Sequence, residues 1–217
     1  MRRIAMTCLA LVALLVVTGA VASTAVAQRL TLSEAGTALQ PGSTFELVGQ
    51  DLLVTTSRGA LECETFFQPP RLAVSLLTNS QGRDELQIKR LENAFRQPCR
   101  SYTGNAAFFL ESLGEVLTLR ATGIATAGPV ALLIRYEHVE FQEDVECFFT
   151  GNRVTGSNSA TATVQPLEVE LGGTLKLDPS RSSVNAKNVC PAEAGIDFSL
   201  PSTESELGEV IDEQVTA

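Results

Sequence analysis

The chain has 217 residues, of which 44% are hydrophobic, and its formal net charge of −9 at pH 7 makes it acidic. Such a charge opposes binding to phosphate backbones and anionic membrane surfaces, which require clustered Lys and Arg. We therefore expect no nucleic-acid partner. The length suffices for one large or two small domains, and no Pro/Gly/Ser-rich linker divides it, so we predict a single domain over residues 28–200.

The first 27 residues have the three parts of a secretory signal peptide. Arg2 and Arg3 form a positive start, residues 4–22 are apolar, and Ala25-Val26-Ala27 offers small residues for cleavage before Gln28. The alternative is a membrane anchor, but the small and polar end of the apolar run favours cleavage. We predict a secreted protein, extracellular or in the cell envelope, without a stable membrane anchor. Loss of the two arginines changes its net charge to −11.

Four of the five cysteines remain after cleavage, namely Cys63, Cys99, Cys147 and Cys190. An even number in an exported chain predicts two disulfides. The alternative is a metal site, but no two of these cysteines have the close spacing of zinc ligands, and the chain has a single histidine. We therefore predict structural disulfides and no metal.

Ring-closure entropy does not choose among the three pairings, but a short internal echo does. Apolar triplets at 52–54 and 132–134 each lead to a cysteine segment, LECETFF at 61–67 and VECFFTG at 145–151, and a later cysteine follows in QPC and NVCP. This echo, over 45–100 and 130–200, favours Cys63 with Cys99 and Cys147 with Cys190. The alternative is a coincidental resemblance between two amphipathic hairpins.

Apolar residues alternate along most of the chain, as at Leu72, Val74 and Leu76 and along residues 130–136. This period of two predicts strands, and with no sustained helical period we expect an all-β, mostly antiparallel sandwich or barrel-like domain. The stretch 84–95, the best helix candidate, is assigned to a strand.

Two further local predictions concern the second half of the chain. Val169 and Leu171 face Leu175 and Leu177 across Gly172-Gly173, which predicts a hairpin because glycine accepts positive φ. Ile196 to Leu200 should join the main sheet. Residues 201–217 contain five acidic residues and no Lys or Arg, which predicts a flexible acidic tail.

The order of these segments resembles a group of small bacterial exported proteins, some described as relatives of a protein activator of alkane oxidation. The resemblance lies in residues 36–63, the QPC cysteine, VECFFTG with the Gly/Ser/Thr-rich segment after it, and residues 188–200, and it covers most of the mature chain. Members often carry Leu-Pro-Trp after the second cysteine, whereas this chain has no Trp and has FFLESL at 108–113. The resemblance implies a disulfide-bonded β domain at or beyond the cell surface and supplies no catalytic residues.

The chain carries no recognised catalytic motif. A Ser-His-Asp triad needs His138, the single histidine, and no Gly-x-Ser-x-Gly elbow is present. His138 lies in the acidic segment 137–146, which predicts a surface residue on a strand. The carboxylates of this segment are candidate Ca²⁺ ligands, but alternation places them on both faces, which favours a solvated hairpin. We expect no cofactor.

Aromatic residues offer the remaining binding candidates. A lectin is disfavoured, because sugar sites use aromatic faces and the chain has no Trp and two Tyr. Neighbours on a strand point to opposite faces, so one ring of each adjacent Phe pair is a candidate for an exposed apolar patch. These weak candidates are Phe66, Phe67, Phe108, Phe109, Phe148 and Phe149.

Two function classes follow. The first is an exported, non-catalytic domain that binds or structures a cell-surface component or an apolar ligand. The second is a small secreted hydrolase of unrecognised type. The sequence favours the first.

Overall fold

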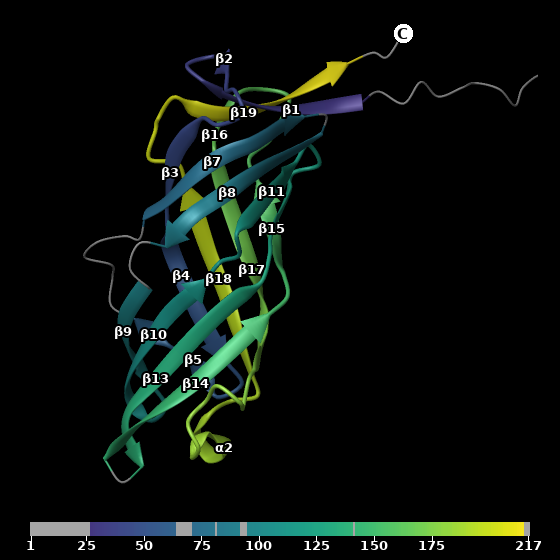
Figure 1. The fold of residues 1–217 in the computed structure, drawn as a ribbon. Coiled ribbons are helices and arrows are strands. Elements are labelled where there is room, and N and C mark those ends of the chain that lie inside the picture. The colour runs from purple at the N-terminus through teal and green to yellow at the C-terminus, as the bar shows by residue number, and fades with distance from the viewer. Residues whose placement is uncertain (1–26, 64–70, 81, 92–94, 141, 215–217) are drawn as a thin grey trace, which may run out of the picture. The chain divides into compact units, whose positions relative to one another are not determined.

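Strands of alternating apolar and polar residues make up most of the described part of the computed structural model, residues 27–63, 71–80, 82–91, 95–140 and 142–214 (Figure 1). Residues 28–212 form one unit, and the predicted signal peptide lies outside the described residues. The elements are β1 Ala27–Glu34, β2 Thr37–Ala38, β3 Thr44–Val48, β4 Gln50–Thr56, β5 Gly59–Ala60, β6 Glu62–Cys63, β7 Arg71–Ser80, β8 Arg83–Leu91, β9 Phe95–Ser101, β10 Gly104–Ser112, β11 Val116–Arg120, β12 Ile124–Ala127, β13 Val130–Glu140, β14 Glu143–Gly151, β15 Val154–Asn158, β16 Gln165–Pro166, β17 Glu168–Leu177, α2 Ala186–Val189, β18 Glu193–Pro201 and β19 Leu207–Gln214.

The predicted class is confirmed: the fold is all-β, with antiparallel sheets that do not form a closed barrel. A four-stranded sheet has the order β16-β19-β1-β2, and a larger sheet holds the other strands. The assignment of 84–95 is confirmed over β8, which pairs with β7 and β11.

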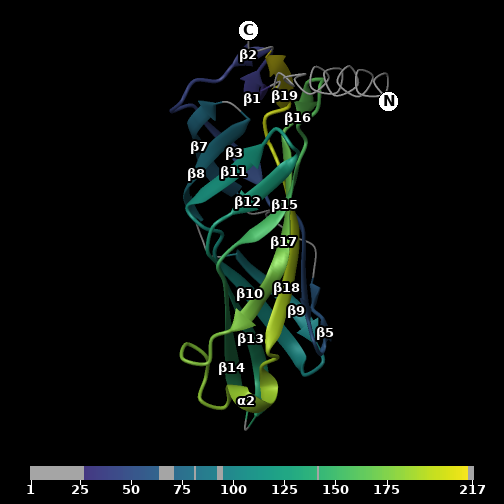
Figure 2. The same cartoon turned by 90° about the vertical axis from the view of Figure 1, so that its right-hand side faces the viewer.

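The larger sheet branches at β17 and β18, which run side by side over nine paired residues (Figure 2). One branch, the first strand set, continues through β15, β12, β11, β8 and β7 to β3. The other, the second strand set, continues from β17 through β14, β13, β10 and β9 to β6, and from β18 to β4 and β5. Inward-facing residues of both sets, such as Leu86, Val154, Phe108 and Ile134, form one buried core.

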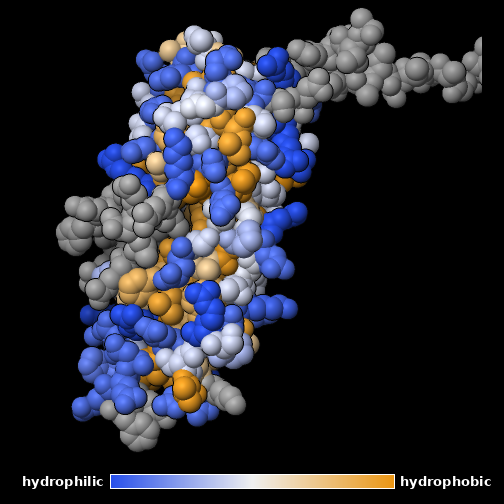
Figure 3. Space-filling view, viewed as in Figure 1, coloured by the Kyte–Doolittle hydropathy of each residue, from blue (hydrophilic) through white to orange (hydrophobic). Residues whose placement is uncertain are grey.

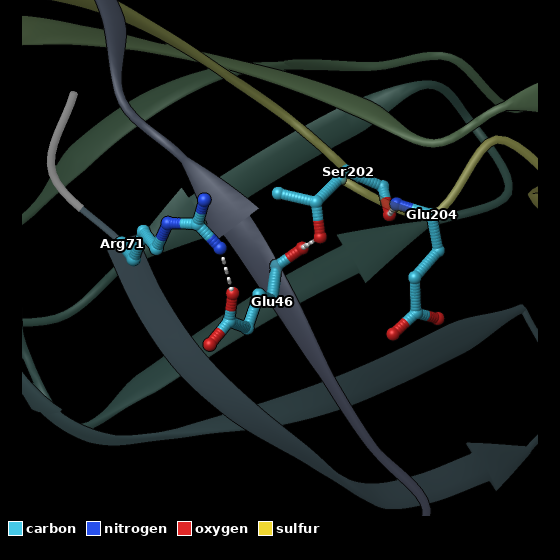
Figure 4. Close-up of polar contacts among 5 residues, drawn as sticks. Glu46, Arg71, Ser202 and Glu204 are labelled. Atoms are coloured by element: carbon cyan, nitrogen blue, oxygen red, sulfur yellow. Dashed lines mark hydrogen bonds and ion pairs between the residues drawn. The ribbon is translucent and has the colours of Figure 1, made fainter. Parts of the chain in front are cut away.

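The first strand set ends where β3 meets the chain leaving β18 (Figure 4). A single bridge joins Leu47 to Ser202, and the N–H of Thr203 donates to the carbonyl oxygen of Glu46 at 3.2 Å. The Glu46 side chain accepts a hydrogen bond from Arg71 of β7 at 2.9 Å. These contacts hold the edge of β3 without a full ladder of strand pairing.

The prediction of a hairpin at Gly172-Gly173 is wrong, because the chain does not turn there and β17 continues through both glycines. Gly172 pairs with Asp197 and Gly173 with Ile196 in one uninterrupted ladder to β18. On the other side of β17, pairing with β15 ends at Gly172, and pairing with β14 begins at Lys176. A Cβ on Gly173 would lie 3.0 Å from Cγ1 of Val154, so the glycine is needed for close packing where β17 changes partner.

The C-terminal segment corrects the predicted tail. The prediction that Ile196 to Leu200 joins the main sheet is confirmed, because these residues belong to β18. Residues 207–214 also form a strand, β19, in which Leu207 and Glu209 are buried. Ser159 Oγ donates to Glu209 at 2.7 Å and Asn158 Nδ2 donates at 3.1 Å. Burial raises the pKa of Glu209, while these hydrogen bonds oppose the rise. These side-chain donors, together with backbone hydrogen bonds from Ser159 and Ala160, offset part of the desolvation of a carboxyl group that the charge of the segment predicts to lie in solvent.

Both predicted disulfides are present, Cys63 to Cys99 and Cys147 to Cys190, with Cα separations of 4.0 and 5.5 Å. The first links β6 to β9, and the second links β14 to the residue after α2. Both lie in the second strand set, and residues 45–100 contribute strands to both sets. The echo in the sequence therefore does not correspond to two sequential structural units.

Candidate functional site

The two described Phe pairs, Phe108-Phe109 and Phe148-Phe149, lie as alternation predicts, with one ring of each pair on each face of the second strand set. Phe108 of β10 and Phe149 of β14 point into the core and are fully buried. Phe109 and Phe148 lie on the outer face, one on each side of Leu133 of β13 in the strand register. Phe66 and Phe67 lie outside the described residues.

Arginine side chains cover the outward rings. The guanidinium of Arg135 lies 5.1 Å from the ring centroid of Phe109, and that of Arg181 lies 3.5 Å from the ring of Phe148. Phe148 is 4% exposed as a result, while Phe109 is half-buried. Apolar surface gathers over β10 and β13 with hydrophilic residues around it (Figure 3). This face is therefore an arginine-capped extension of the core, since cation–π stacking shields the rings.

Residues 178–185, which we call the strap, run along the part of β14 that β17 does not pair. The N–H of Phe148 donates to Ser182 Oγ at 3.0 Å, and the N–H of Glu146 donates to Ser183 Oγ at 2.9 Å. Serine hydroxyls thus replace the carbonyls of a neighbouring strand, which protects an edge that otherwise invites pairing with another chain. The Cys147–Cys190 disulfide ties the residue that follows α2, the helix after the strap, to β14.

Polar side chains from two turns hold the short helix that follows the strap. Arg58 Nη1 donates to the carbonyl of Asn188 at 2.8 Å and to Tyr102 Oη at 3.3 Å, and Tyr102 donates to the carbonyl of Val189. The ring of Tyr102 lies 5.7 Å from that of Tyr136, whose pKa is raised chiefly by burial. Arg58 and Tyr102 thus supply hydrogen-bond donors to carbonyl groups at the end of α2, so the cluster has a structural role and holds the helix against the second strand set.

The acidic segment 137–146 forms the hairpin between β13 and β14. His138 is exposed, and its Nδ1 lies 3.8 Å from an oxygen of Asp144. Within the described residues no serine hydroxyl hydrogen-bonds to this imidazole, and no group of three or more His, Cys, Asp or Glu side chains is arranged to hold a metal ion.

An open surface groove of about 420 Å³ crosses β15, β17 and β18, and it is a candidate binding site. Gly172 faces outward from β17, and its missing side chain leaves the sheet surface open, whereas Gly156 and Gly173 line the groove but face the core side of their strands. A Cβ on Gly156 would lie 1.7 Å from the carbonyl oxygen of Glu170, so β15 and β17 approach each other only because this residue is glycine.

Carboxylates border the groove on two strands. Asp197 of β18 and Glu170 of β17 line it, and Ser157 of β15 donates to Glu170 at 3.1 Å. Glu168 lies on the same outer face and accepts a hydrogen bond from Ser199 at 3.0 Å. None of these three carboxylates has an ion-pair partner among the described residues. Uncompensated negative charge on rigid strands is suited to a positively charged ligand.

The groove is only partly visible in the amino-acid sequence. Glu168 and Glu170 alternate with the buried Val169 and Leu171, which signals an outward acidic face on β17. The position of Asp197 opposite Gly172, however, is set by the β17–β18 register.

In comparisons with known proteins, no family model, no curated protein and no solved structure matches this chain. None of the described residues belongs to a helix with the length and hydrophobicity required to cross a bilayer.

Proposed function

We propose that this chain is an exported, non-catalytic β domain that binds a positively charged partner through the acidic groove on β15, β17 and β18. The partner is a basic segment of a protein or polymer at the cell surface or outside the cell. One observation carries this proposal: Glu170 and Asp197 border an open groove and have no cation partner among the described residues.

Three further features support the proposal. The signal-like first 27 residues and the two disulfides fit an oxidising compartment outside the cytoplasm. The same features accord with the bacterial exported group that the chain resembles. The net charge of −11 after cleavage attracts cationic partners over long range.

The arginine-capped face is a weaker candidate for ligand binding. An apolar ligand would have to displace Arg181 from Phe148, whereas the groove is open without rearrangement. The hydrolase alternative would need a nucleophile beside His138. The described polar contact of this imidazole is with Asp144, so the site does not support that alternative.

Titration of the mature protein with octalysine tests the proposal. The double variant Glu170→Gln/Asp197→Asn should weaken binding about tenfold or more, because two attractive charges leave the groove. The matched control Glu111→Gln/Glu115→Gln removes the same charge from exposed positions outside the groove and should change affinity by less than about threefold. Equal weakening in both variants would show that overall charge alone attracts the peptide. Absence of octalysine binding to the parent protein would refute the cationic ligand.

A further inference from the structure

The two disulfides differ in their access to solvent. Cys147 is fully buried and Cys190 is 6% exposed, and both belong to the core. Cys63 is half-buried, and together with Cys99 it lines a separate surface pocket of about 480 Å³. Cys99 is as buried as Cys190, at 6% exposed, so the difference in access lies at Cys63, which a reagent can approach from this pocket.

The pocket carries charges of both signs, with acidic groups in excess. Glu62 of β6 and Glu137 of β13 line it, and Arg100 of β9 contributes the positive charge. Glu62 pairs with Arg100 in the strand register, but no ion pair joins them in the described structure. The two glutamates and one arginine give the pocket a net negative charge, which favours cationic small molecules over anionic ones.

Within the described residues, the strand that carries Cys63 has a short pairing. Strand β6 contains two residues, and its described ladder to β9 consists of the pairs Glu62 with Arg100 and Cys63 with Cys99. Strand β9, by contrast, is held to β10 over seven paired residues. Cleavage of the Cys63–Cys99 bond thus requires local movement of β6 and leaves the β9–β10 ladder in place.

We propose that the Cys63–Cys99 disulfide is a thiol–disulfide exchange site that reacts in the folded protein with small cationic or neutral thiols. The thiolate of the small molecule attacks Sγ of Cys63, the more exposed sulfur, and forms a mixed disulfide. The Cys63–Cys99 bond breaks, and Cys99 Sγ leaves with the electron pair and takes a proton from water. A second small thiol then attacks the mixed disulfide, which releases the oxidised small-molecule disulfide and leaves both cysteines reduced.

This inference is independent of the acidic groove, which lies on β15, β17 and β18, whereas the pocket lies on β6, β9, β10 and β13. Accessible disulfides are in general the labile or regulatory ones, while buried disulfides are structural. The chain therefore combines one structural disulfide and one reactive disulfide in the same strand set.

The test treats the folded mature protein with cysteamine or with mercaptoacetate, small thiols of opposite charge, and traps free thiols with N-ethylmaleimide. Peptide mapping by mass spectrometry then reports the rate at each cysteine. We expect Cys63 and Cys99 to be labelled at least about tenfold faster than Cys147 and Cys190, with the first adduct on Cys63. Per unit of thiolate, cysteamine should react several-fold faster than mercaptoacetate.

Matched variants test the role of pocket charge. Glu62→Gln/Glu137→Gln should reduce the preference for cysteamine, whereas Glu111→Gln/Glu115→Gln, which removes the same charge elsewhere, should leave it unchanged. Far-ultraviolet circular dichroism recorded in parallel should show the β signal retained while Cys63 reacts. In the parent protein, equal labelling of the two disulfides, or labelling that proceeds only as the β signal is lost, would overturn the proposal. This outcome does not depend on any variant.

Discussion

Removal of the Cys147–Cys190 disulfide tests whether this bond keeps the strap on β14. In the double variant Cys147→Ala/Cys190→Ala, a closed loop of 43 residues opens. Chain entropy gives a loss of about 4 kcal/mol in the free energy of unfolding. With an m value of about 2 kcal/mol/M, this loss shifts the urea midpoint by about 2 M. The loss is a large fraction of the 5–15 kcal/mol that is typical of whole domains, so the variant is best studied at low temperature.

The local effect distinguishes the strap from simple ring closure. Hydrogen exchange of the Glu146 and Phe148 amides should accelerate, because the serine hydroxyls that accept from them are no longer held in place. The control Cys63→Ala/Cys99→Ala opens a loop of 36 residues and should lose about the same global stability. Its Glu146 and Phe148 amides should stay protected in native conditions. Equal exposure of these amides in both variants, or a loss of less than about 1 kcal/mol in the first, would show that the disulfide does not hold the strap on β14.

Three further predictions concern single side chains. Burial raises the pKa of Glu209 above its usual 4.5, so its contribution to stability is complete below that value and is lost as the pH rises through the raised pKa. The thermal midpoint of Glu209→Gln relative to the parent should therefore increase from pH 4 to pH 8, and a constant difference would contradict the buried carboxyl group. Gly156→Ala places a Cβ against the Glu170 carbonyl and should cost about 1–3 kcal/mol or more in urea unfolding, whereas Gly172→Ala, with its nearest atom at 3.3 Å, should cost clearly less. Tyr102→Phe removes the hydroxyl that bonds Val189 and Arg58 and should cost about 0.5–1.5 kcal/mol by the same assay, and no loss would show that solvent replaces these bonds.

Alternation in the sequence predicts the strands and the facing of the Phe pairs, because both depend on local backbone geometry. Phe108 and Phe149 are buried, and Phe109 and Phe148 lie on the outer face, as a period of two requires. The groove was not predictable in the same way. It depends on the register that places Asp197 beside Gly172, and register is fixed by contacts between residues distant in the chain.

The acidic C-terminal segment shows where composition misleads. Residues 207–214 carry enough charge to suggest disorder, yet they form β19 between β16 and β1, and its Leu207 and Glu209 are buried. Compositional rules treat every carboxyl group as solvated. Asn158 and Ser159, however, donate hydrogen bonds to Glu209 that offset part of the desolvation of its carboxyl group. These donors lie some 50 residues away, so no local window of sequence contains the information.

The parity of the apolar residues around Gly172-Gly173 does, however, contain information that distinguishes a strand from a hairpin. In a two-residue hairpin, Leu171 would pair with Thr174 and Val169 with Lys176, and partners across a hairpin share a face. A polar Thr174 and a charged Lys176 would then lie in the core beside Leu171 and Val169. In a continuous strand every odd position faces inward, and these include Leu171 and Leu175, which are buried, while Lys176 is exposed. The unbroken odd parity therefore indicates one long strand, and the glycines mark the point where its neighbour on one side changes from β15 to β14.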